Sequence, residues 1–183
     1  MATLANLFGG TAHLSPLLRK VRRLGLPTPD ALLRVAVARG CLHYAPGDFI
    51  PAAVKDPGAE RLSHAELAIA MISGAQQYDP QCMRCAAQLL SGDTLDAREV
   101  ARLARMERCI PALAYIARQG RQSDDQRRAY WVEILERLPQ GGRVNAVPLW
   151  PHPSRFVSQA GYRRGGKGGG PVWLRPQPRG VSG

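Results

Sequence analysis

Helix-start signals recur through the first 140 residues and constrain the fold more than any other feature of the sequence. Proline follows a residue that can cap a helix at Ser15-Pro16, Thr28-Pro29 and Asp79-Pro80. Proline is favoured at the first helical position because the N–H that it lacks would have no partner there. Ser63 and Glu66 have the spacing of a capping box, in which the side chain of each accepts a hydrogen bond from the backbone of the other. Each of the four signals predicts the start of a helix.

A further helix start at Asp96 is followed by a break. We expect Leu103 and Met106 on the inward face of this helix. Pro111 argues against one long helix through the region, because proline removes a backbone donor and crowds the preceding turn. The sequence therefore predicts a break near Arg108 and a new helix after it.

The next helix is expected to end at Gly120, since glycine commonly follows the last helical residue. A last helix begins near Ser123, and its predicted inward face consists of Trp131, Ile134, Leu135 and Leu138. The total is about seven helices.

The chain is therefore predicted to be all-α. Several apolar helices end on glycine, with the sequences LLRVAVARG, ELAIAMISG, MRCAAQLLSG and ALAYIARQG. This weak repetition fits a short stack of helical hairpins, and the short connections fit a plain helical bundle equally well. A domain of about 140 residues buries roughly two-thirds of its unfolded surface, which is enough for a core without metals or disulfides.

The charge distribution divides the chain into two parts. Residues 1–140 hold 18 basic and 14 acidic residues, whereas residues 141–183 hold seven basic residues and no acidic one. The second part is also rich in glycine and proline. We expect a helical domain at 1–140 and a basic, mostly irregular C-terminal arm at 141–183.

Cys82 and Cys85 form a CxxC motif within an apolar helical segment. A structural zinc site needs four ligands, and the sequence has no second pair with suitable spacing. Buried, reduced core cysteines are the preferred interpretation, so no metal and no cofactor are predicted. The sequence also lacks the motifs of nucleotide-binding loops, serine hydrolases and zinc proteases. The protein is therefore predicted not to be an enzyme.

The strongest functional signal is the mixture of arginine, aromatic residues and glycine in the arm. Arginine binds phosphate with two parallel hydrogen bonds and stacks on bases, and aromatic rings are stacking surfaces for single-stranded nucleic acid. The candidate nucleic-acid-binding residues of the arm are Arg155, Tyr162, Arg163, Arg164, Lys167, Trp173, Arg175 and Arg179. The polar side of the first helix adds Arg19, Arg22 and Arg23, although a solvated helix face also explains such a cluster.

Two short apolar runs lie within the arm, at 144–147 and 172–174. They are expected either to form a small hairpin around the glycine-rich turn or to attach the arm to the domain or to a neighbouring protein. A disordered, solubilising extension is the alternative that the composition also permits.

These features predict a non-enzymatic nucleic-acid-binding protein, a subunit of a nucleoprotein assembly, with RNA or single-stranded DNA favoured. The alternative is a helical adaptor that binds an acidic protein partner, because a polycation does not distinguish well between polyanions. No stretch reaches the roughly 18 apolar residues of a membrane span, and residues 1–10 lack the features of a secretory signal. A cytoplasmic location without membrane contact is expected.

Overall fold

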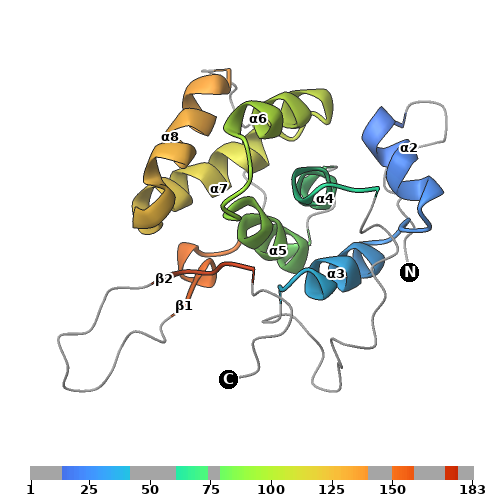
Figure 1. Cartoon of the computed structure of the whole chain (residues 1–183), viewed down its shortest axis with the longest axis horizontal. Helices are drawn as coiled ribbons and strands as arrows, with labels where there is room; N and C mark the ends of the chain where they lie inside the picture. The colour runs from blue at the N-terminus through green and yellow to red at the C-terminus, as the bar shows by residue number, and fades with distance from the viewer. Residues whose placement is uncertain (1–13, 42–60, 74–78, 140–149, 159–171, 177–183) are drawn as a thin grey trace.

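The computed structural model describes residues 14–41, 61–73, 79–139, 150–158 and 172–176. This part of the chain is all-α, as predicted, with one short β-hairpin added (Figure 1). Its seven α-helices are α2 (Pro16–Arg23), α3 (Pro29–Ala38), α4 (His64–Ile72), α5 (Pro80–Leu90), α6 (Ala97–Met106), α7 (Ile110–Ser123) and α8 (Arg128–Arg137). None of these helices is long and apolar enough to cross a bilayer.

The predicted capping residues begin their helices. The side chains of Ser15, Thr28 and Asp79 accept backbone N–H bonds from the first turns of α2, α3 and α5. At the start of α4 both bonds of the capping box form: Ser63 N donates to Glu66 Oε2 at 2.8 Å, and Glu66 N donates to Ser63 Oγ at 3.0 Å. Local signals within one helical turn therefore set these helix starts.

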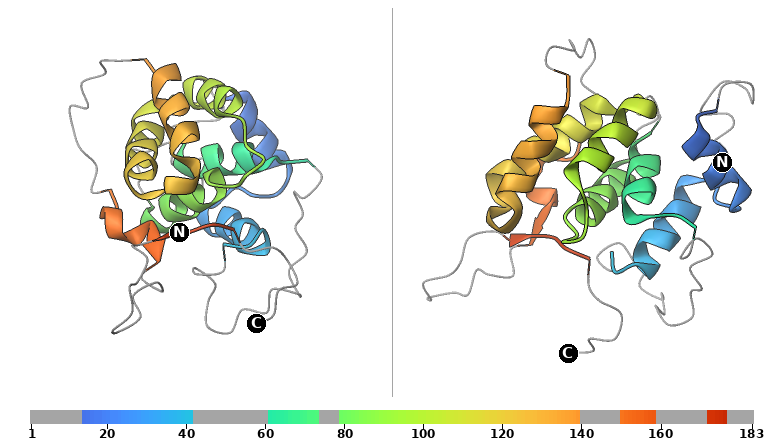
Figure 2. Two further views of the ribbon diagram at one scale, coloured as in Figure 1. Left: turned by 60° about the vertical axis from the view of Figure 1, so that its left-hand side comes forward. Right: turned by 45° about the horizontal axis from the view of Figure 1, so that its top comes forward.

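Helix α4 forms the centre of the core. Every residue from Leu67 to Ile72 is buried, which agrees with an apolar pattern that runs nearly all round the helix. Helices α2, α3, α5 and α6 all pack against it, and the two further views show it enclosed by its neighbours (Figure 2).

Helices α6, α7 and α8 form a layer in which α6 and α8 run in the same direction. At the start of α8, Arg127 Nη2 donates to Leu95 O, just before α6, at 3.1 Å. At the other end, Arg105 Nη2 of α6 donates to Arg137 O of α8 at 2.6 Å. Helix α7, which connects them, therefore runs in the opposite direction and packs mainly against α8. The predicted break is also present, and Arg108 between α6 and α7 has φ 55°, in the left-handed region.

Two details of the predicted helices are wrong. Met106 is 47% exposed rather than inward-facing. Helix α7 does not end at Gly120 but continues to Ser123. Gly120 serves packing instead: a Cβ built on it would lie 2.5 Å from two ring atoms of Trp131. The indole of α8 occupies the space that any larger residue would fill.

The described part of the arm contains the 3₁₀ helix η5 (Pro153–Arg155) and the antiparallel strands β1 (Val157–Ser158) and β2 (Val172–Trp173). Val157 pairs with Trp173, and Ser158 pairs with Val172. The run at 172–174 is attached to the domain, as one of the two predictions had it, but its partner strand is 157–158 rather than the run at 144–147. The run at 144–147 lies outside the described residues.

The contact between Gly120 and Trp131 gives a stability prediction. In an open helical site Gly120→Ala would stabilise by up to about 1 kcal/mol, because alanine is the better helix former. Here the added methyl group collides with a fully buried ring, so we expect a net loss of about 1–3 kcal/mol. Urea denaturation measures the change, and a variant as stable as the parent would contradict this packing.

Candidate nucleic-acid interface

The arm lies on the helices through an aromatic cluster. Phe156 and Trp173 stack with their ring centroids 5.5 Å apart and an interplanar angle of 17°. Trp173 also lies 5.5 Å from Trp131 of α8, and its Nε1 donates to Ala87 O of α5 at 3.4 Å. Phe156 is 2% exposed and Trp173 is 3% exposed, so the hairpin contributes to the core.

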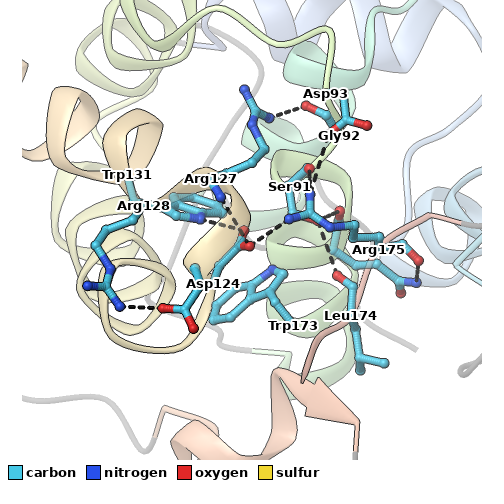
Figure 3. Close-up of polar contacts among 12 residues, drawn as sticks. Ser91, Gly92, Asp93, Asp124, Arg127, Arg128, Trp131, Trp173, Leu174 and Arg175 are labelled. Carbon is cyan, nitrogen blue, oxygen red and sulfur yellow. Dashed lines mark hydrogen bonds and ion pairs between the residues drawn. The ribbon is translucent and has the colours of Figure 1, made fainter. Parts of the chain in front are cut away.

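Arg175 adds a polar attachment directly after strand β2 (Figure 3). Its Nη2 donates to Asp124 Oδ1 at 2.6 Å, and its Nη1 donates to Ser91 O at 2.6 Å. Asp124 Oδ2 accepts a bond from Trp131 Nε1 at 2.8 Å. The Asp124 side chain is 2% exposed and that of Arg175 is 22% exposed, so this ion pair is largely shielded from solvent.

Backbone groups of the arm complete the attachment. Gln88 Nε2 donates to Arg175 O at 2.7 Å, and Ser91 Oγ donates to Leu174 O at 3.1 Å. Leu174 N donates to Phe156 O at 3.0 Å, which extends the hairpin by one bond. The end of α5 therefore binds the segment after β2 through its backbone carbonyl groups as well as through the Arg175 side chain.

These contacts change the interpretation of two predicted binding residues. A tryptophan ring with 3% exposure has no free face on which a base could stack, so the prediction for Trp173 does not fit its position. The guanidinium of Arg175 is already paired with Asp124. In this structure both residues hold the arm on the helices.

The other candidates of the arm fall into two groups. Arg155 is exposed at the end of η5. Tyr162, Arg163, Arg164, Lys167 and Arg179 lie outside the described residues.

The arginines of α2 are placed as the sequence predicts. Arg19, Arg22 and Arg23 are all exposed, and neither an ion pair nor a hydrogen bond engages their guanidinium groups within the described residues. Lys20, on the same helix, instead pairs with Glu66 of α4 at 2.7 Å.

Glu107 attaches the start of α2 to the end of α6. Its Oε2 accepts a hydrogen bond from Ser15 Oγ. Burial raises the pKa of the Glu107 carboxyl, and the hydrogen bond from Ser15 opposes the rise. The Glu107 carboxyl group thus holds the start of α2, the helix that carries these arginines, against the end of α6.

One basic feature was missed by the sequence reasoning. Arg98, Arg102 and Arg105 are exposed on α6. Their spacings of four and three residues put them on one helix face. The spacing is present in the sequence AREVARLARM, but the two acidic residues at 96 and 99 leave this segment with a smaller charge excess than the acid-free arm.

All four cysteines are free and buried, as expected for core residues. Burial raises the pKa of the Cys109 thiol to about 12. The pKa of Cys85 is also raised, first by a hydrogen bond with Cys41 and then by burial. A protonated thiol is a poor nucleophile and a poor metal ligand. Within the described residues, no three histidine, cysteine or acidic side chains lie together as a metal site would require.

The shielded ion pair predicts a large effect at Arg175. Arg175→Gln leaves the Asp124 carboxylate buried without its cation, and we expect a loss of about 3 kcal/mol in the free energy of unfolding. Arg128→Gln is the matched control, because the Arg128–Asp125 pair nearby is exposed and should change stability by at most about 0.5 kcal/mol. Equal effects of the two substitutions in urea denaturation would contradict the shielded attachment.

Glu107 predicts a pH dependence. A carboxyl whose pKa is higher in the folded state contributes stability below its ordinary pKa and loses it as the pH rises through the raised value. The parent should therefore lose stability relative to Glu107→Gln as the pH rises from below to above the ordinary pKa of a glutamate, about 4.3. Urea denaturation of both proteins across this range measures the difference. A constant difference, or one that changes in the opposite sense, would show that burial does not disfavour the Glu107 charge.

No family model matches the chain, and neither a curated protein nor a solved structure is found to be similar to it.

Proposed function

We propose that this chain is a non-enzymatic nucleic-acid-binding protein that acts as a subunit of a cytoplasmic nucleoprotein assembly. The segment 159–171 of its C-terminal arm binds phosphates, with Arg155 and Arg179 beside it. RNA or single-stranded DNA is the favoured ligand, and the helical domain carries the arm and meets the protein neighbours.

The observation that carries this proposal is the pairing of Ser158 with Val172. The segment between these residues starts and ends at one place on the domain, because its two flanking strands are paired and Trp173 is buried. The segment contains Arg163, Arg164 and Lys167 and no acidic residue. Fixing the ends of a binding segment reduces the conformational entropy that it loses when it binds.

The acidic residues of the domain already have partners, which supports the same proposal. Many carboxylates of the described domain are already engaged in helix caps or ion pairs, among them Glu66, Asp79, Asp96, Asp124 and Glu133. The described part of the domain therefore offers few carboxylates that are free to pair with additional cations. An excess of seven positive charges in residues 141–183 favours an external polyanion.

The residue types favour an accessible, single-stranded ligand. Arg163 and Arg164 can each form bidentate phosphate contacts, and Tyr162 adds a ring of the kind on which bases stack. The glycines of 165–170 have no side chain to keep a phosphate backbone away.

A salt titration tests the proposal. Arg163→Gln/Arg164→Gln should weaken binding to a short single-stranded RNA, and the slope of log K against log salt should become shallower by roughly 0.7 for each lost phosphate contact. Fluorescence anisotropy of a labelled strand measures both quantities.

The control is Arg118→Gln/Arg121→Gln, which removes the same charge from exposed positions on α7. It should leave the slope unchanged. A parent protein that binds neither RNA nor single-stranded DNA would contradict the proposal. Binding of an acidic polypeptide as tight as that of RNA would favour the adaptor alternative.

A further inference from the structure

Arg98, Arg102 and Arg105 form a row on α6. The row lies between the two sets of predicted binding residues, those of the arm and those of α2. Before α6, Arg175 of the arm contacts Ser91 and Asp93. After α6, Glu107 binds Ser15 at the start of α2. Helix α6 therefore spans from the attachment of the arm to the helix that carries Arg19, over a length of about 15 Å for its ten residues.

The row has the geometry of a linear charge array. Arg98, Arg102 and Arg105 follow one another at about 6 Å and about 4.5 Å along the helix axis, given a rise of 1.5 Å per residue. They lie on the side of α6 opposite its buried residues Val100 and Ala104. A row of cations at this spacing is complementary to the closely spaced charges of a nucleic acid strand.

The cations of the row are not neutralised by the domain. Within the described residues Arg98, Arg102 and Arg105 form no ion pair, whereas Arg128 and Arg137 of α8 do. Arg105 uses one nitrogen to bind a carbonyl of α8, and Arg102 contacts the sulfur of Met106. Neither partner is a carboxylate, so the positive charges of Arg102 and Arg105 are not neutralised by these contacts.

The acidic residue of α6, Glu99, lies one turn before Arg102 but forms no ion pair with it within the described residues. Glu99 is near Tyr130 of α8, where burial chiefly raises the pKa of the phenol and the charge of Glu99 adds to the rise. On a helix, Glu99 is about 100° from Arg98. The Glu99 carboxylate therefore lies at the edge of the row, on the side that faces α8.

We infer that the exposed face of α6 binds the phosphate backbone of a single-stranded nucleic acid and joins the arm to the arginines of α2 in one binding track. The inference rests on the proposed function, because it extends the path of the same ligand. Arg98 and Arg102 contact successive parts of the strand after it leaves the arm, and Arg108, exposed just after α6, adds a further cation at that end of the row.

The test compares two variants with equal charge changes. Arg98→Gln/Arg102→Gln should bind a single-stranded RNA long enough to extend beyond the arm roughly tenfold more weakly than the parent, with a shallower salt slope. Arg118→Gln/Arg121→Gln removes two exposed arginines of α7 and should change the affinity by less than about twofold. Circular dichroism confirms that both variants remain folded.

The outcomes separate this inference from the proposed function. Parent-like binding by Arg98→Gln/Arg102→Gln, or an equal loss in the α7 control, would overturn the α6 track. If Arg163→Gln/Arg164→Gln still weakens binding in that case, the proposed function stands and only the track fails. If the parent binds no single-stranded nucleic acid, both fail.

Discussion

The buried carboxylate of Asp124 holds together three parts of the fold. It accepts hydrogen bonds from Trp131 at the start of α8 and from Arg175 of the arm, and it lies directly after α7. A buried charge is costly unless it is paired and hydrogen-bonded, and here both of its oxygens have partners. The turn between α7 and α8 and the position of the arm therefore depend on each other.

The arm therefore contains residues that attach it to the helices and a separate basic segment between the two strands. Phe156, Trp173 and Arg175 hold it on α5, α7 and α8 by burial and by a shielded ion pair. The basic segment between the two strands has both of its ends fixed by that attachment. A polyanion that binds there meets cations already connected to a rigid domain, so it need not order the whole arm.

Local and non-local information explain what the sequence could and could not predict. The starts of α2 to α6 were predictable because a cap is decided within one turn. The end of α7 was not predictable, because Gly120 does not terminate the helix. It is a glycine because the Trp131 ring of α8 packs against it and leaves no room for a side chain. The partner of Arg175 lies 51 residues away in the sequence, and no spacing rule identifies such a contact. The row on α6 is the opposite case, since its helical spacing is present in the sequence itself.

The most direct measurement is hydrogen exchange at the amide of Leu174, which donates to Phe156, in the full-length protein with and without a saturating single-stranded RNA. If the segment between the strands binds while the hairpin stays attached, this amide remains protected in the complex. Loss of its protection on RNA binding would contradict the account, because it would mean that Trp173 and Arg175 leave the helices to contact the ligand themselves.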